Sequence, residues 1–247
     1  MILTESAEWY AALSARKGFS MLYDLIMSGG DMTEVLIGVM ASVFVVFCTL
    51  PIHEYAHAFV ATKLGDETPR LKGRLTLNPL AHIDIIGAIM IIVVGFGYAK
   101  PVPVNARRFK NPKAGMALTA FAGPMSNIVM ALFFLLLSNG AAMIYNSSFA
   151  LVWYVSCAFF SYAAVINVSL AVFNFLPIPP LDGSKILALI IPPKYYFKYM
   201  QYERYIIYAV FALIIFGVLD APLSFFTGII MNGLKWVADL PFKLIAG

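Results

Sequence analysis

Charged residues are scarce in this chain of 247 residues. They make up 12% of the sequence, whereas hydrophobic residues make up 61%. A soluble domain carries about 25% charged residues, because its surface faces water. Seventeen basic and 13 acidic side chains cannot cover so apolar a chain, so lipid must solvate much of its surface. The composition excludes a water-soluble globule and predicts an all-α polytopic membrane protein.

Cysteine is also rare. Cys48 and Cys157 both lie inside apolar runs, which excludes a disulfide framework and a zinc site built from thiolates. The net charge is +4, but membrane proteins gather basic residues on their cytoplasmic side for topological reasons. No basic run is interleaved with stacking aromatic residues, so nucleic acid is excluded as a partner.

The N-terminal segment, residues 1–32, lacks the pattern of a cleavable signal, because glutamates stand where positive charge is expected. Residues 9–27 alternate apolar and charged positions, which predicts an interfacial amphipathic helix. We expect one intramembrane core over residues 33–192, followed by C-terminal transmembrane or interfacial helices over residues 193–247. No sequence feature specifies an oligomeric state.

Long uncharged runs predict the helices that cross the membrane. Four runs are long enough for most or all of a crossing, namely residues 35–52, 114–137, 149–181 and 205–219. Residues 223–236 form either a further span or an amphipathic segment on the membrane surface. The sequence therefore predicts four to six transmembrane helices, with the N-terminus outside and the first core helix running inward.

The third run is longer than a crossing needs. Pro177, Pro179 and Pro180 lie in its last part, so we expect the helix to stop near Phe173. The chain would continue as extended backbone at membrane depth, which is tolerated only where protein or water lines it.

Residues 85–99 form a short apolar run rich in Ile, Val and Gly, which favours extended or re-entrant structure. If this run dips into the membrane and returns, the nine basic residues between positions 63 and 113 share the cytoplasmic side. We therefore expect a short re-entrant β-hairpin-like segment between the first and second core helices. Its exposed edge could pair with an extended substrate, or the hairpin could simply anchor the protein.

The inner end of the first span carries a pattern typical of a metal site. His53 and His57 are four residues apart and therefore share one helix face, with Glu54 beside them. In a metallohydrolase, zinc acidifies a water molecule and such a carboxylate transfers its proton to the leaving amine. Three ionisable side chains this close together in a membrane helix are costly unless they are paired or ligated, which argues against a purely structural role.

A catalytic zinc needs a third protein ligand and one open position. Asp182 is the candidate, because the expected topology returns it to the depth and side of the membrane where the first helix ends. Asp182 could also cap the helix expected over residues 183–191, and the two roles can coexist.

Four segments resemble the site-2 protease family of intramembrane zinc metalloproteases. They are HEYAH at 53–57, NPLAHID at 78–84, AGPMSN at 122–127 and NFLPIPPLDG at 174–183. The resemblance extends over about residues 35–190. The chain has neither an inserted PDZ domain nor a nucleotide-binding domain, so it is similar to the compact members of that family.

The resemblance implies one Zn²⁺ per chain, bound by His53, His57 and Asp182, with Glu54 as general base. It implies that the substrate is a partly unwound transmembrane segment of another protein, cut in regulated intramembrane proteolysis. We expect a multi-pass integral protein of a prokaryotic cell membrane, with the lipid bilayer as partner and the active site near the cytoplasmic side.

Three further polar residues are candidates for roles beside the metal. We interpret His82 as a hydrogen-bonded loop histidine near the re-entrant segment, with transition-state stabilisation, gating or metal ligation as alternatives. A fourth protein ligand would close the open position that catalysis needs. The Asn127 amide either stabilises an oxyanion or joins helices. The resemblance implies that Asn174, expected in extended backbone, binds the backbone of an unwound substrate.

Two other functions fit parts of the sequence. A catalytically inactive, protease-like membrane chaperone would keep the fold, although the intact Glu54 argues against loss of catalysis. A divalent-metal transporter would use the buried His and Asp residues as a pathway, but ionisable residues are lacking in the other spans.

Overall fold

The structure is a computed structural model that describes residues 32–94, 99–144 and 149–246. Within these ranges the regular elements are all helical and no strand occurs. The predicted N-terminal amphipathic helix and residues 95–98 of the predicted hairpin lie outside the described residues.

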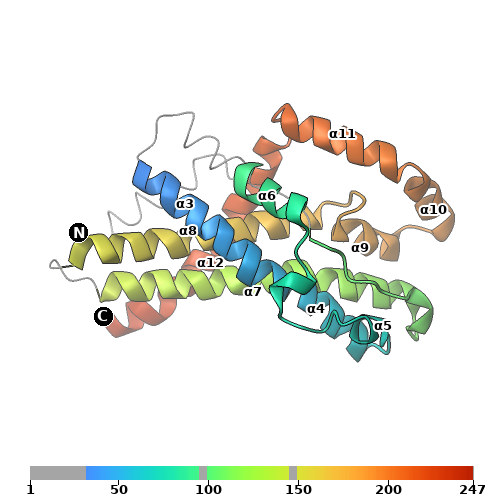
Figure 1. Cartoon of the computed structure of the whole chain (residues 1–247), viewed down its shortest axis with the longest axis horizontal. Coiled ribbons are helices and arrows are strands. Elements are labelled where there is room, and N and C mark those ends of the chain that lie inside the picture. Colours follow the sequence, from blue (N-terminus) through green and yellow to red (C-terminus); the bar gives the residue numbers. More distant parts are fainter. Residues whose placement is uncertain (1–31, 95–98, 145–148, 247) are drawn as a thin grey trace.

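Two long helices form the centre of the fold. Helix α7 (Pro112–Met143) and helix α8 (Ala150–Phe175) pack against each other along most of their length, as Figure 1 shows. Many of the side chains buried on these helices are small, which lets helix backbones approach closely, as is typical in membranes. They include Ala131, Ala158, Ala163, Ala164 and Ala171.

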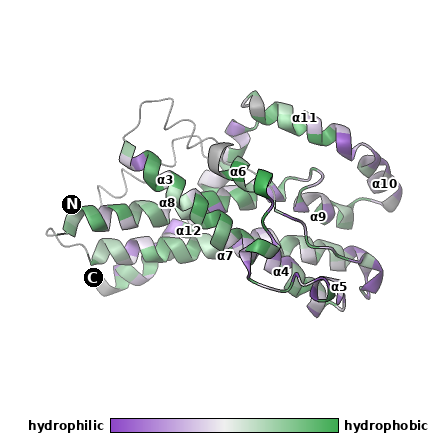
Figure 2. Cartoon of the chain, in the orientation of Figure 1, coloured by the Kyte–Doolittle hydropathy of each residue, from purple (hydrophilic) through white to green (hydrophobic). Residues whose placement is uncertain are grey.

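A third long helix crosses this pair. It comprises α3 (Met32–Phe44), the π-helical turn η1 (Val45–Thr49) and α4 (Leu50–Lys63) without interruption. Among the described residues, three helical stretches could cross a membrane by length and composition: Met32–Lys63, Pro112–Met143 and Ala150–Phe175. They contain the first, second and most of the third predicted span. In Figure 2, α3 and much of α7 and α8 are hydrophobic.

The π turn has an identifiable cause. Pro51 lies just after it; proline lacks an N–H group, and its ring clashes with the carbonyl of the preceding helical turn. A wider turn relieves that clash. Buried pairs of residues repeat every four residues along this helix, whereas an α-helix has 3.6 residues per turn. The pairs are Ala41/Ser42, Val45/Val46, Thr49/Leu50, His53/Glu54 and His57/Ala58. The wide turn offsets part of this mismatch and keeps the HEYAH residues on the buried face.

The predicted β-hairpin-like segment is wrong over its first part, because residues Ile85–Val94 form helix α6. The Asp84 carboxylate accepts hydrogen bonds from the amides of Ile86 and Gly87, both at 3.0 Å, and so satisfies the start of the helix. Ten apolar residues in a helix also satisfy their backbone internally, which an isolated hairpin cannot do in lipid. The abundance of Ile and Val, which favours strands, does not outweigh these two effects.

The segment between His82 and Lys100, which contains α6 and is called the α6 excursion below, has its two ends in contact. The amide of Lys100 donates to the carbonyl of His82 at 2.8 Å. The guanidinium of Arg74 donates to the carbonyl of Ala81 and, at 3.4 Å, to that of Lys100. The chain therefore leaves and returns at the same place. In the sequence, the short helices α5 (Thr68–Leu71) and η2 (Pro79–Ala81) precede this segment and η3 (Ala106–Arg108) follows it.

Four helices follow α8: α9 (Asp182–Ile190), α10 (Pro193–Gln201), α11 (Glu203–Ile215) and α12 (Asp220–Ala246). Helix α12 packs against α7 and α8. It buries Leu223, Met231 and Ala238, and its Asp239 accepts a hydrogen bond from Asn139 of α7 at 3.0 Å. Residues 223–236 therefore pack against the central helices, but α12 is not among the helices that could cross a membrane by length and composition.

Asp66 joins the loops on both sides of the α6 excursion. Its fully buried carboxylate accepts hydrogen bonds from the amides of Thr68 and Asn105 at 3.0 and 2.6 Å. Burial alone would raise the pKa of Asp66, but the hydrogen bonds from Thr68 and Asn105 and the charge of Arg108 hold it below its usual range. The ionised carboxylate therefore stabilises the fold.

We expect Asp66→Asn to destabilise the protein by about 1–3 kcal/mol at neutral pH, because buried donors lose a charged acceptor. Because the folded-state pKa is lowered, this contribution is present above the unfolded-state pKa of about 4 and is lost as the pH falls through the folded-state value. Thermal unfolding in detergent at pH 7 and pH 3 measures both effects. Glu67→Gln, which alters an exposed pair with Arg70, is the control. Equal stability of Asp66→Asn and wild type at pH 7 would contradict the prediction.

Candidate metal centre

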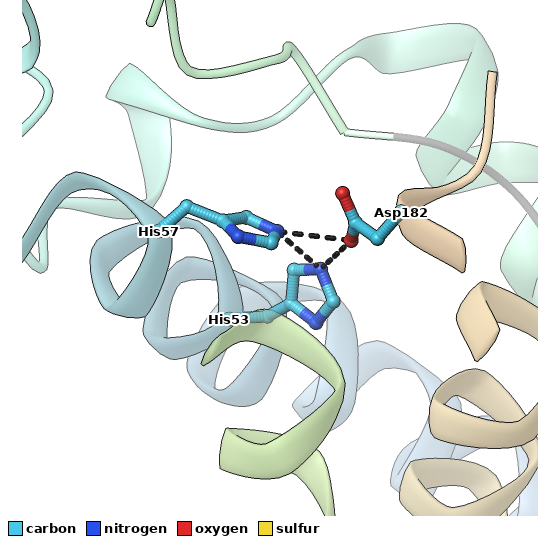
Figure 3. A group of neighbouring side chains, drawn as sticks. All are labelled: His53, His57 and Asp182. Atoms are coloured by element: carbon cyan, nitrogen blue, oxygen red, sulfur yellow. Dashed lines mark hydrogen bonds and ion pairs between the residues drawn. The ribbon is translucent and has the colours of Figure 1, made fainter. Parts of the chain in front are cut away.

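Three predicted ligands from distant parts of the chain converge where α4 and α9 meet. His53 and His57 lie one turn apart on α4, and Asp182 is the first residue of α9 (Figure 3). The Nε2 atoms of the two histidines are 3.0 Å apart. Asp182 Oδ2 lies 3.4 Å from Nε2 of His53 and 3.0 Å from Nε2 of His57. Among the described residues, this is the one group of three or more His, Cys, Asp or Glu side chains that could hold a metal ion.

The chain reaches Asp182 through the proline-rich segment that follows α8. The helix ends at Phe175, two residues later than expected, and residues 176–181 lead into α9. A side chain at Gly183 would overlap the carbonyl groups of Phe175 and Leu176, so the tight turn requires glycine there. Leu181, not Asp182, occupies the N-cap position, and no side chain caps this helix. The alternative that Asp182 serves as a helix cap is therefore wrong.

Helix α7 orients the His57 ring. The carbonyl oxygen of Thr119 lies 2.7 Å from Nδ1 of His57, so the protonated Nδ1 donates and the lone pair of Nε2 faces the other ligands. A histidine that ligates a metal usually has such a partner on its other nitrogen.

Gly123 provides the space into which the two imidazoles project. A Cβ atom at this position would overlap the His57 ring and lie 2.5 Å from Nε2 of His53. The absence of a side chain therefore lets α7 pack directly over the ligand atoms. Glycine permits such close helix approach, but the sequence does not indicate which side chains it faces.

The donor set and its dimensions fit a zinc ion. Two ligand atoms on a tetrahedral zinc, each about 2.0–2.2 Å from the metal, are about 3.3 Å apart. The three separations between Nε2 of His53, Nε2 of His57 and Oδ2 of Asp182 are 3.0, 3.0 and 3.4 Å. All three side chains are buried. Two imidazoles and one carboxylate are also a typical protein ligand set of catalytic zinc.

The electrostatic surroundings favour an ionised Asp182. Burial opposes ionisation, but the charge and hydrogen bond of His57 when both its ring nitrogens are protonated, the hydrogen bond from His53 and the ammonium group of Lys185 hold the pKa of Asp182 well below its usual range. The Nζ atom of Lys185 lies 3.1 Å from Oδ1, the oxygen that does not face the histidines. Sequence reasoning missed Lys185 and Thr119. Only the position of Lys185, one turn after Asp182, could have indicated its role.

Glu54 is next to a ligand in the sequence, and Asn127 is one turn from Gly123, which faces the ligands. Glu54 follows His53 on α4 and is buried, with 7% of its surface exposed. Asn127 lies one turn beyond Gly123 on α7 and is 1% exposed, and its buried Nδ2 has no hydrogen-bond partner in the described structure. Asn127 therefore presents a buried amide donor without a partner among the described residues, one turn from the glycine that faces the ligands.

Of the other two candidates, Asn174 lies in a different setting from the one expected, whereas His82 lies in the expected one. Asn174 is in the last turn of α8, not in extended backbone, and its Nδ2 donates to the carbonyl of Leu170 at 2.9 Å. His82 is fully buried outside the three-residue group, and its Nε2 lies 2.7 Å from the carbonyl oxygen of Thr76. His82 thus has the surroundings of a hydrogen-bonded loop histidine at the base of the α6 excursion.

Comparison with known proteins gives one consistent family. Residues 40–217 match the model of peptidase family M50. YwhC of Bacillus subtilis is 44% identical over 168 residues, which cover 66% of this chain and 74% of the relative. Rip2 of Mycobacterium tuberculosis is 30% identical over 139 residues, covering 55% of this chain and 51% of the relative. MJ0611 of Methanocaldococcus jannaschii is 32% identical over 136 residues, covering 55% of this chain and 62% of the relative.

All three relatives are named as putative zinc metalloproteases. The chain spans about half of the mycobacterial relative and about three quarters of the one from Bacillus. No significant match to a solved structure was found. The matched region contains both histidines, Glu54 and Asp182, together with all three helices that could cross a membrane except the first residues of α3. The chain therefore belongs to peptidase family M50, the family of the site-2 proteases.

Proposed function

We propose that this chain is a zinc-dependent endopeptidase that hydrolyses peptide bonds in transmembrane segments of other proteins. The observation that carries the proposal is the convergence of His53, His57 and Asp182 in a buried group next to Glu54, with both histidines on a helix that could cross a membrane. Family membership supports the metalloprotease activity, and the burial of the group among such helices supports a substrate within the bilayer.

Each residue of the site has a separate role in the proposed reaction. His53, His57 and Asp182 would hold one zinc ion, which supplies the Lewis acidity that activates water and polarises the scissile carbonyl group. The Glu54 carboxylate takes a proton from the attacking water and delivers it to the leaving nitrogen. The Asn127 amide donates a hydrogen bond to the oxygen on which negative charge develops. Thr119 holds His57 in the tautomer that keeps Nε2 available.

The substrate must lose helical hydrogen bonds before its carbonyl groups can be attacked. We propose that the α6 excursion re-enters the membrane beside the site, with His82 fixing its base through the hydrogen bonds to Thr76 and Lys100. Asn174, at the end of α8, lies where the helix gives way to the segment that leads to Asp182, a position suited to contact with an unwound substrate.

The distribution of charge supports an active site near the cytoplasmic side of a prokaryotic cell membrane. The loops that carry nine basic residues between positions 63 and 113 are hydrogen-bonded to each other at the end of α4 that follows His57. Positive charge of this density is typical of cytoplasmic loops.

Reconstitution in lipid vesicles tests the proposed function. We expect the purified protein to cut a model transmembrane peptide within the apolar segment of that peptide. Cleavage should stop after treatment with a chelator and resume when zinc is added back. Flux of zinc into the same vesicles, without cleavage, would favour the transporter alternative. Peptide hydrolysis that persists without metal would overturn the proposal.

A further inference from the structure

The two carboxylate oxygens of Asp182 have different partners. Oδ2 faces Nε2 of both histidines at 3.0 and 3.4 Å, whereas Oδ1 lies 3.1 Å from the Nζ atom of Lys185. The Asp182 side chain is 8% exposed and that of Lys185 is 40% exposed. The ion pair therefore lies at the boundary between the buried ligands and the surface of the protein.

Lys185 is well placed to keep this arrangement. It lies three residues after Asp182 on α9, so both side chains occupy the same face of the first helical turn. The turn itself is fixed, because Gly183 packs tightly against the end of α8 and Ser184 Oγ donates to the carbonyl of Leu181 at 2.7 Å. An ion pair between a buried carboxylate and a partly shielded ammonium group is less screened than one fully in water.

A carboxylate can bind a metal through one oxygen or through both. Binding through both oxygens would occupy part of the coordination sphere, whereas catalysis by zinc needs an open position. A cation that occupies Oδ1 leaves Oδ2 as the single donor. Partners of this kind, which contact a ligand and not the metal, orient the ligand and tune the site.

We propose that Lys185 is a positioning residue that holds Oδ1 of Asp182, so that this carboxylate presents only Oδ2 to the metal. The proposal rests on the proposed function, because it assumes that the three-residue group binds zinc. It concerns the geometry of the ligand and not the cleavage step, so binding measurements test it without a substrate.

The test compares purified wild type, Lys185→Met, Lys185→Arg and a control, Lys194→Met. Methionine keeps most of the length and removes the charge; arginine keeps the charge. Lys194 is exposed on α10 and makes no ion pair with the described carboxylates. Zinc affinity is measured by competition with a chelator, and the coordination number by the visible absorption of the Co²⁺-loaded protein.

We expect Lys185→Met to bind zinc at least about tenfold more weakly, as is usual when a partner of a metal ligand is removed. Its Co²⁺ absorption per bound ion should fall, because a second oxygen raises the coordination number. Lys185→Arg should restore both properties, and Lys194→Met should match wild type. Unchanged affinity in Lys185→Met, an unchanged Co²⁺ spectrum, or failure of arginine to restore them would overturn the proposal. If wild type itself binds no zinc, the proposed function fails instead.

Discussion

Glu54→Gln is expected to abolish proteolysis while the protein keeps its zinc. Glutamine has the size of glutamate but cannot accept the proton of the attacking water, and a general base of this kind contributes about 10²–10⁴-fold to the rate. Glu54 is not among the residues that converge as metal ligands, so the metal content should remain that of wild type.

The measurement compares membrane-derived peptides by quantitative proteomics in cells that express wild type or Glu54→Gln at matched levels. Fragments that end inside transmembrane segments should be present with wild type and vanish with the variant, which would also name the substrate. Glu67→Gln, which changes a partly exposed glutamate after the same helix, is the matched control and should behave as wild type. Identical fragment profiles for wild type and Glu54→Gln under several stresses would contradict the prediction and favour the chaperone-like alternative.

Gly123→Ala is expected to eliminate zinc binding, although it adds a single methyl group. The new Cβ would overlap the His57 ring and lie 2.5 Å from Nε2 of His53. Either α7 must move away from α4 or the imidazoles must rotate out of position, and overpacking of this kind typically costs about 1–3 kcal/mol. Both responses separate the ligand atoms, so zinc content and cleavage should be lost together.

The same helix offers a control for this substitution. At Gly140 of α7 a Cβ would meet only the ring of Phe242, at 4.0 Å, which is ordinary contact. Gly140→Ala should therefore bind zinc as wild type does. Metal analysis of both purified variants measures their zinc content, and circular dichroism establishes that each remains helical. Full zinc content in Gly123→Ala would mean that α7 does not confine the ligands as described.

The candidate ligands were predictable because they depend on two simple regularities. The pairing of His53 and His57 follows from helical periodicity, and Asp182 follows from the topology that the distribution of charge implies. The site residues that escaped prediction depend on tertiary packing. Thr119 is 62 residues away from His57 in the sequence and acts through a backbone carbonyl, which any residue type could supply.

The fold was predictable where apolar runs are long and ambiguous where they are short. Three long runs became helices that could span a membrane. The short run at residues 85–94 contains residues that favour strands, yet Asp84 caps it as a helix. Asn174 was expected outside α8 because the predicted end of the helix lies two residues too early. The prolines after the helix set the last position at which it can end, but they do not determine its last helical residue.

The hydrogen bond between Lys100 and His82 closes the α6 excursion at its base. Because its two ends are fastened together, the core closes whether the stretch from 83 to 99 is long or short, and the entropic cost of lengthening such a loop grows only slowly. Related chains can therefore exchange or enlarge this stretch without displacing α4 or α7, which hold the histidines. The part of the molecule that would meet a substrate can thus diversify while the part that performs the chemistry stays fixed.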